Sequence, residues 1–261
     1  MHGKTVLLQA EQGFGDTIQF IRYLPMVIAK GGRVVLEIPD DLRPLIGHID
    51  GVTAIMRRGE ALPHFDVHCP LMSLALAFGT TLDTIPAPVP YLHAPAERIS
   101  SWRIRLAGTK GPRVGLVWSG KPTHKNDHNR SIPLALLAPL LRMPGMTFVS
   151  LQKDYRDTDR AALGALPLLR LDDALSDFAD TAAVIAALDL VIAVDTAAAH
   201  LTGALGKPLW LLLPAIGDWR WLTERADSPW YPSARLFRQP RIGDWQSALA
   251  EVRRELALFA R

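Results

Sequence analysis

Residues 189–210 read DLVIAVDTAAAHLTGALGKPLW and contain the parts of a strand–turn–helix unit. Residues 189–194 form an apolar, β-branched run that is typical of a buried strand, and the small and apolar residues 197–205 favour a helix. Asp195 and Thr196 lie in the turn between them, where Thr196 can cap the helix. A unit of this kind predicts a parallel sheet covered by helices, with the turn at the carboxyl edge of that sheet.

The same alternation extends over the whole chain and predicts an α/β protein made of two successive halves. Apolar runs predict strands at 5–9, 33–38, 52–56, 66–69, 113–118, 147–152, 189–194 and 208–213. Helical patterns follow the turn at 11–16 up to residue 30, and recur at 71–78, 96–107, 131–143, 176–188, 197–205 and 244–259.

Residues 79–95 interrupt this pattern and indicate a domain boundary. They are rich in proline and have neither a helical nor a strand period. We therefore expect an N-terminal domain over 1–95 and a second domain over 96–243. The amphipathic segment 244–261 is expected to form a helix that packs back toward the first domain.

Composition excludes several classes of protein. The chain has 261 residues, 49% of them hydrophobic, and a formal net charge of +3, which gives no basic face for nucleic acid. Its single cysteine, Cys69, excludes an internal disulfide and a cysteine-based zinc site. No apolar run is long enough for a signal peptide or a membrane span, so we expect a cytoplasmic protein without a membrane span.

Residues 10–20, AEQGFGDTIQF, place two glycines between a predicted strand and a predicted helix. Gly13 and Gly15 allow close approach of a ligand to the backbone, but Ile18 stands where a dinucleotide fingerprint needs its third glycine. Asp16 has two interpretations, which do not exclude each other. It is either the N-cap of the helix or a carboxylate at the carboxyl end of the first strand, facing a ligand.

Residues 119–134, SGKPTHKNDHNRSIPL, form a polar loop between a strand and a helix. A P-loop is disfavoured because Pro122 replaces the Ser or Thr that would hold magnesium. The spacing of the two histidines and Asp127 fits no metal-site pattern, so contact with phosphate is favoured over a metal or a solvated loop. The potential cations of the loop are Lys121, His124, Lys125, His128 and Arg130.

Two further features carry alternatives. His200 lies one turn into the helix that follows Asp195, where a core role and a functional role are equally favoured. Residues 215–239 hold three tryptophans within twelve residues, interleaved with Arg220 and Arg225. This cluster is either a domain interface or a base-stacking wall with an arginine for phosphate.

Taken together, five motifs resemble the bacterial heptosyltransferases (the ADP-heptose family), and the domain of that type found after tetratricopeptide repeats in particular. They are GFGDTIQFIRYLP, WSGKPTHKNDHNRSIPL, SLQKD, VDTAAAHLTGALGKPLW and, at the end, DWRWL followed by SPWYPSARLFRQ. The resemblance implies a GT-B architecture, in which two Rossmann-like domains with parallel sheets flanked by helices face each other across a cleft. It also implies a nucleotide-diphosphate sugar (ADP-, UDP- or GDP-linked) as donor, an acceptor that stays unknown, and N-terminal tetratricopeptide repeats in the full-length protein.

The resemblance also assigns roles to residues. Asp16 matches the proposed general base, and Lys121 or Arg130 looks like the cation that neutralises the diphosphate. The donor-binding turn would consist of Asp195, Thr196, the backbone of Ala197 and Ala198, and His200 of the DTxxxH pattern. The remaining predicted substrate-binding residues are Gly13, Gly15, Gln19, Ser119, Gln152, Trp219 and Arg220.

These roles imply metal-independent, inverting glycosyl transfer without a cofactor. Two departures from the family matter: Ala197 stands where a glycine is usual, and the first domain is shorter. The alternative function is a non-catalytic module that binds a nucleotide sugar, or a scaffold attached to a repeat protein.

Overall fold

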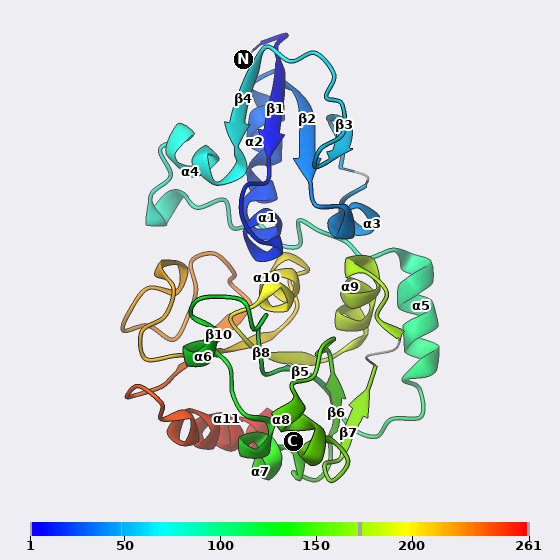
Figure 1. Cartoon of the computed structure of the whole chain (residues 1–261), viewed down its shortest axis with the longest axis vertical. Helices are drawn as coiled ribbons and strands as arrows, with labels where there is room; N and C mark the ends of the chain where they lie inside the picture. Colours follow the sequence, from blue (N-terminus) through cyan, green and yellow to red (C-terminus); the bar gives the residue numbers. More distant parts are fainter. Residues whose placement is uncertain (1, 48, 172–173, 260–261) are drawn as a thin grey trace.

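The fold consists of two halves, one above the other in Figure 1, each with a parallel β-sheet flanked by helices. A computed structural model describes residues 2–47, 49–171 and 174–259. The first sheet has the strand order β3-β2-β1-β4, and all of its strand pairs are parallel. Its strands are β1 (Thr5–Gln9), β2 (Arg33–Ile38), β3 (Val52–Arg57) and β4 (Val67–Pro70).

The helices of the first half begin directly after its strands. After β1 the chain forms α1, a 3-10 turn and α2, so that α1 starts at the carboxyl end of the central strand. The bounds are α1 (Phe14–Phe20), η1 (Ile21–Tyr23), α2 (Leu24–Ala29), η2 (Asp40–Leu42), α3 (Arg43–Ile46), η3 (Leu71–Ser73), α4 (Leu74–Ala77) and η4 (Leu82–Thr84).

The second sheet has six parallel strands in the order β10-β9-β8-β5-β6-β7. Counted from β5, this is the strand order of a Rossmann fold, in which the chain reverses direction across the sheet between its first and fourth strands. Here that switch point lies between β5 and β8. The strands are β5 (Arg113–Val117), β6 (Thr147–Ser150), β7 (Leu168–Arg170), β8 (Leu190–Val194), β9 (Leu209–Leu213) and β10 (Ala234–Arg238).

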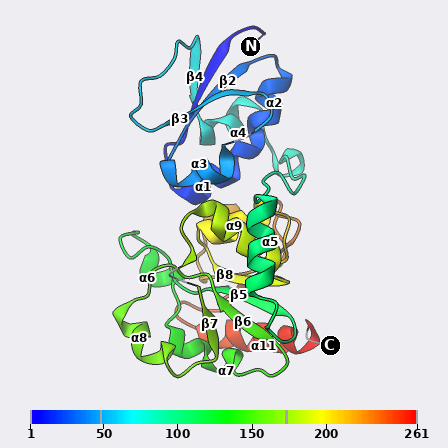
Figure 2. The same cartoon turned by 90° about the vertical axis from the view of Figure 1, so that its right-hand side faces the viewer.

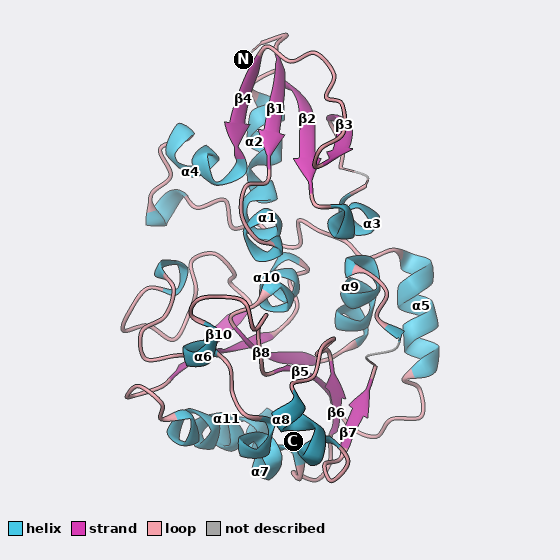
Figure 3. Cartoon of the chain, viewed as in Figure 1, coloured by secondary structure: helices cyan, strands magenta, loops and turns pink. Residues whose placement is uncertain are grey.

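Helices cover both faces of the second sheet (Figure 3). The side chains of β8 show this directly, because Leu190, Ile192 and Val194 face one apolar cluster while Val191 and Ala193 face the other. Toward the first sheet lie α9 (Phe178–Ala187) and α10 (Ala197–Ala204), with α5 (Ala96–Arg105) alongside α9 (Figure 2). On the other face lie η5 (Leu134–Leu137), α7 (Ala138–Leu141), α8 (Asp157–Leu163) and α11 (Trp245–Phe259).

The C-terminal helix α11 packs on the second domain, which corrects the expectation that it returns to the first. Trp245, Val252 and Leu256 are buried in the cluster that fills the far face of the second sheet. That face is apolar and needs cover, so the amphipathic stripe of α11 finds its partner there. Residues 260 and 261 of this segment lie outside the described residues.

Three local predictions were wrong. Residues 131–143 form a 3-10 turn and one turn of α-helix instead of a single helix. Pro133 and Pro139 each lie at the start of one of these pieces, because proline lacks the backbone N–H that the interior of a continuous helix requires. Strands β7 and β10 were not predicted: β7 has three residues, and β10 follows a segment dominated by tryptophan and proline.

None of the described helices is both long enough and apolar enough to span a bilayer.

The two halves are joined by direct packing and by one buried arginine. Helix α1 packs against α10, and the backbone N–H of Tyr91 donates to the carbonyl of Ala204 over 3.0 Å. Arg22 is only 4% exposed, and its guanidinium donates to the carbonyls of Gln19 (2.8 Å) and Trp230 (2.7 Å) and to the hydroxyl of Tyr91 (3.0 Å). Since Trp230 belongs to the second half, Arg22 ties the first half to it.

We expect Arg22→Met to destabilise the fold. The variant leaves several buried carbonyl groups without a donor, so it should lower the free energy of unfolding by about 2–4 kcal/mol. Urea denaturation followed by circular dichroism measures this. Arg33→Met is the control, since Arg33 is exposed and its Nη2 donates to the carbonyl of Gly3. Equal midpoints for the two variants would contradict the anchoring role of Arg22.

Candidate functional site

The carboxyl ends of β5 and β8 bring four predicted site residues together. After β5, the backbone N–H of Ser119 donates to Oε1 of Gln152 over 3.1 Å. After β8, the backbone carbonyl of Asp195 accepts a hydrogen bond from Nη1 of Arg130 over 2.8 Å. The contact between Arg130 and Asp195 crosses the switch point of the Rossmann-like sheet, which is where open α/β sheets bind their ligands, and Gln152, which follows β6, lies beside it.

Arg130 lies beside a second arginine. The buried carboxylate of Asp127 lies 3.6 Å from Nε of Arg130 and is also paired with Arg156, so two guanidinium groups share one carboxylate. The guanidinium of Arg130 lies directly on Gly120, where a Cβ atom would come within 2.8 Å of Cζ. Glycine at position 120 therefore leaves room for a charged group against the end of β5.

The rest of the basic loop is solvent-exposed. Lys121, His124, Lys125 and His128 all lie on the surface, so the structure brings only Arg130 of the five predicted cations into the sheet edge. The described residues contain no group of three or more His, Cys, Asp or Glu side chains that could hold a metal ion.

The N-terminus of α10 has no side-chain cap. Thr196 is the N-cap residue, as predicted, but its hydroxyl donates back to the carbonyl of Val194 over 3.2 Å and accepts nothing from the helix. The capping hydrogen bond expected of Thr196 is therefore absent from this helix end. Ala197 and Ala198 are half-buried and too small to cover the first turn. Its backbone N–H groups and the positive end of the helix dipole face a site suited to an anion.

Asp195, His200 and Tyr231 lie in a row of polar contacts under this turn. Oδ1 of Asp195 lies 3.6 Å from Nε2 of His200, and Nδ1 of His200 lies 2.9 Å from the hydroxyl of Tyr231. Burial by itself raises the pKa of Asp195, but His200 and Arg130 outweigh it and hold that pKa below its ordinary value. Asp195 is therefore a carboxylate turned toward His200.

The first domain contributes Asp16 from the opposite side. The N-cap of α1 is Gly13 and Asp16 is three residues inside the helix, which corrects the N-cap interpretation of Asp16. Its Oδ2 accepts a hydrogen bond from the backbone N–H of Gly13 over 2.9 Å. Its Oδ1 is paired with Arg220 of the second domain, and 25% of the Asp16 side chain remains exposed.

Arg220 is the centre of a second cluster. It is 7% exposed, and it donates to Oε1 of Gln19 over 2.6 Å and to Oδ1 of Asp218 over 2.8 Å, in addition to Asp16. The indole of Trp219 lies over the guanidinium, with 4.7 Å between Cζ and the ring centroid. Trp219 is 55% exposed, so this aromatic surface is open at the rim of the site.

A close approach between the backbone of α1 and the side chain of His200 connects the two clusters. A Cβ atom at Gly15 would lie 2.7 Å from Cδ2 of His200, so α1 reaches α10 only because residue 15 is a glycine. The domains meet at this point by direct contact between α1 and α10. His200, 5% exposed, thus serves both the Asp195 turn and the interface between the domains.

Buried donors without a protein partner mark the same region. Within the described part of the chain they include Nε2 of Gln19, Oγ of Ser119 and Nε of Arg130. Leaving a buried polar group unpaired costs free energy, so such groups are normally satisfied by a ligand or water. Two of the three are donors only, which favours a ligand rich in oxygen acceptors.

The sequence interpretation missed four residues of this region. Asp127 was considered only as a metal ligand and organises the arginines, and Asp218 holds Arg220. Trp221 and Tyr231 enclose His200, with ring centroids 5.4 and 5.7 Å from it. The last of the five motifs contains Asp218, Trp221 and Tyr231, but no local pattern in the sequence points to their contacts.

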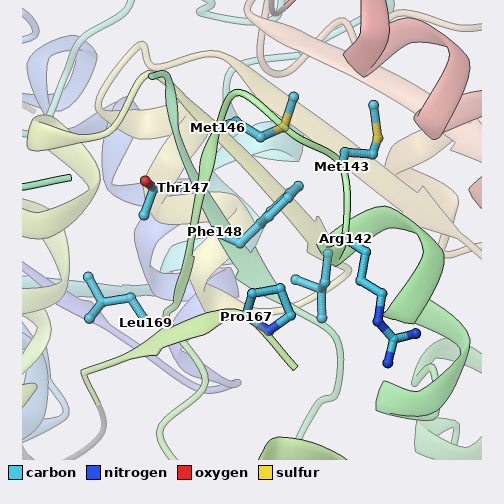
Figure 4. Close-up of a pocket in the computed structure, with 8 residues that line it drawn as sticks. Arg142, Met143, Met146, Thr147, Phe148, Pro167 and Leu169 are labelled. Carbon is cyan, nitrogen blue, oxygen red and sulfur yellow. The ribbon is translucent and has the colours of Figure 1, made fainter. Parts of the chain in front are cut away.

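A surface hollow elsewhere on the second domain is unrelated to these groups. It is lined mainly by apolar side chains around Met146, Thr147 and Phe148 (Figure 4). Thr147 is the first residue of β6, so the hollow lies at the amino edge of the sheet, opposite the cluster around Asp195. It contains none of the predicted site residues.

Comparison with known proteins identifies the fold. No model of a known protein family matches the chain. The glycosyl transferase family 9 structure from Veillonella parvula superposes with a TM-score of 0.67 at 11% identity, over 99% of this chain and 97% of that one. The ADP-heptose LPS heptosyltransferase II of Escherichia coli gives 0.63 at 15% identity, over 98% of each chain. The chain therefore has the GT-B fold of the heptosyltransferases, as the sequence resemblance implied.

One curated relative aligns over the whole chain. Protein FlbA of Caulobacter vibrioides is 29% identical over 100% of this chain, which corresponds to 47% of the relative. The chain thus spans about half the length of the relative that it matches.

We expect Gly15→Ala to destabilise the protein although alanine favours helices. The new methyl group overlaps His200, and overpacking of about 1–3 kcal/mol exceeds the helix gain of at most about 1 kcal/mol. Gly13→Ala is the matched control, because a Cβ there meets only Oδ2 of Asp16 at an ordinary 3.4 Å. Urea unfolding compares the two, and a Gly15→Ala protein as stable as Gly13→Ala would contradict the close contact.

We also expect Asp195→Asn to change the pH dependence of stability. Because the folded state lowers the pKa of Asp195 below 3.8, its carboxylate stabilises the fold above that pH and loses this effect as the pH falls. The variant should be less stable than the wild type at pH 7, and the difference should shrink below about pH 4. The exposed Asp157→Asn is the control. A difference between wild type and Asp195→Asn that is constant from pH 7 to pH 3 is the contrary result.

Proposed function

We propose that this GT-B domain is a glycosyltransferase that moves a sugar from a nucleotide-diphosphate donor to an acceptor hydroxyl, by inversion and without a metal ion. One observation carries the proposal. A guanidinium with a buried unpaired nitrogen (Arg130) and the uncapped N-terminus of α10 meet at the switch point of the second sheet. This combination suits a diphosphate, which is anionic and rich in acceptor oxygens.

The donor would lie mainly on the second domain. Its diphosphate would contact Arg130 and the backbone at Ala197 and Ala198, with Lys121 of the exposed loop as a further cation. Thr196, Ser119 and Gln152 would line the same edge. Asp195 would not touch the phosphates, because its carboxylate faces His200 and holds that side chain in place. The exposed indole of Trp219 is proposed as the wall on which a ring of the ligand stacks.

Asp16 is the proposed general base. It would take the proton of the acceptor hydroxyl while the acceptor oxygen forms its bond to the anomeric carbon. The bond from that carbon to the phosphate oxygen breaks, and the nucleoside diphosphate leaves with the electron pair. Arg130 and the N-terminus of α10 would stabilise the charge that develops on the leaving group. Arg130 and this helix end would thus take the role that a metal ion has in other transferases.

The names of the similar proteins guide the choice of donor. One structural neighbour is an ADP-heptose transferase, so ADP-linked sugars are tested first, followed by UDP- and GDP-linked ones. The chain matches about half of its curated relative, which leaves room in such a protein for a further domain. The tetratricopeptide repeats and the cytoplasmic location implied by the sequence remain part of this proposal.

A second candidate function is a module that binds a nucleotide sugar without transferring it. The observation that favours it is that both carboxylate oxygens of Asp16 already have protein partners, Gly13 and Arg220. The two functions share the donor site and differ only in whether bound donor is turned over.

We expect calorimetry to show binding of ADP, UDP or GDP, and Arg130→Met to weaken it by about 10- to 100-fold, the effect of losing a hydrogen bond between charged groups. Arg142→Met is the control, because Arg142 lines the hollow at the opposite edge of the sheet. No binding of any of the three nucleotides by the wild type would refute the donor site.

We expect Asp16→Asn to bind the same nucleotide as the wild type and to release nucleoside diphosphate from the matching donor about 10²–10⁴-fold more slowly, because the base is lost. Release is measured by a coupled assay. Binding without any turnover by the wild type identifies the non-catalytic module instead, and equal rates for both proteins would exclude Asp16 as the base.

A further inference from the structure

Arg220 has contacts within its own loop as well as with the first domain, and the loop contacts fix its orientation. The 3-10 turn η7 (Trp219–Trp221) is capped by Asp218, whose Oδ1 accepts hydrogen bonds from the backbone N–H of Arg220 over 3.1 Å and from its Nη1 over 2.8 Å. The ring of Trp219 covers the guanidinium. An arginine fixed in this way loses little side-chain entropy when it binds a further group.

The remaining donors of Arg220 reach helix α1. Nε donates to Oε1 of Gln19 over 2.6 Å, and Nη2 donates to Oδ1 of Asp16. Asp16 and Gln19 are one turn apart on the same face of α1, so the planar guanidinium spans both. The other oxygen of Asp16 is held by the N–H of Gly13 over 2.9 Å. The plane of the carboxylate is thus determined by one contact from each domain.

Arg220 and Arg130 differ in the charged groups that surround them. At Arg130, two arginines face two carboxylates, Asp127 and Asp195, so the charges balance, and Nε of Arg130 has no hydrogen-bond partner. At Arg220, one guanidinium lies between two carboxylates, Asp16 and Asp218, which leaves an excess of negative charge. This excess repels a diphosphate from Arg220, and no such excess is present at Arg130.

We infer that Arg220 is a positioning residue that orients Asp16 across the domain interface, and that it is not a ligand of the donor phosphates. The inference rests on the proposed function only in taking Asp16 as the base. Orientation of a catalytic group is worth a large factor in rate, so a base that loses its alignment costs about 10²-fold even when substrate still binds. Of the two alternatives that the sequence left open for this cluster, the inference takes the domain interface and not the phosphate ligand for Arg220.

The test separates orientation from binding with three variants. Arg220→Met removes the charge and Arg220→Lys keeps the charge without the planar fork. Arg225→Met is the control, because Arg225 lies in the same loop and is paired with the exposed Asp227. Two quantities are measured: the Kd, by calorimetry with the nucleotide that the wild type binds, and the rate at which nucleoside diphosphate is released from the matching sugar donor. A third, solvent exchange of the Gly13 amide proton by NMR, reports the Asp16 contact without any substrate.

For Arg220→Met we expect a Kd within about threefold of wild type, and release slowed by about 10²-fold with kcat, not KM, affected. Exchange of the Gly13 amide should become at least about tenfold faster, since the carboxylate that it binds is no longer held. Arg220→Lys should recover part of the rate, and Arg225→Met should match the wild type in all three quantities.

A weakening of nucleotide binding by about 10-fold or more in Arg220→Met, with unchanged Gly13 exchange, would overturn the inference and make Arg220 a phosphate ligand. If the wild type neither binds nor turns over any nucleotide sugar, the proposed function fails, while Gly13 exchange still decides whether Arg220 holds Asp16. If Arg220→Met does not fold, Asp218→Asn loosens the same arginine without removing it. That variant should show the same split between Kd and rate, and a wild-type rate in it would count against the inference.

Discussion

The packing of α1 against α10 is the contact on which the arrangement of the site depends. Each helix begins at the carboxyl end of a central strand, so their contact sets the two sheet edges against each other. The approach is close because residue 15 has no side chain and the buried ring of His200 fills the space that a Cβ would take. Asp16, one residue further along α1, is placed opposite the second domain for the same reason.

Around this contact the site has two different charge environments. The second domain gathers Arg130 and Arg156 about Asp127 beside an uncapped helix N-terminus. Opposite α1, Arg220 lies between two carboxylates, Asp16 of α1 and Asp218 of the second domain's own loop. A donor phosphate and an acceptor hydroxyl have opposite requirements, one for positive charge and the other for a proton acceptor. The separation of the two environments therefore suits a transfer reaction.

The sequence predicted the local elements well where they are buried. Eight of the ten strands in the described residues were predicted from their apolar or β-branched residues. The signal is strongest in central strands such as β8, because a parallel sheet that is covered on both faces needs continuous hydrophobic residues. The short edge strand β7 and the strand β10 lacked that signal. Local reasoning also failed at helix ends: Asp16 is not the N-cap of α1, and the hydroxyl of Thr196 bonds to Val194. Both side chains have competing partners that the choice of residue type cannot reveal.

The sequence by itself determined the α/β class, the turn at Asp195 and the group of residues near the site, because strand periodicity, glycine turns and motif order are local properties of the chain. The tertiary structure alone decided which charges meet. Asp16 and Arg220 are 204 residues apart, and neither has a neighbour in sequence that indicates the other. Their pairing follows from the approach of α1 to α10 and the fold of the loop after β9. For the same reason α11 covers the second sheet, where an apolar face was left open, and not the first domain.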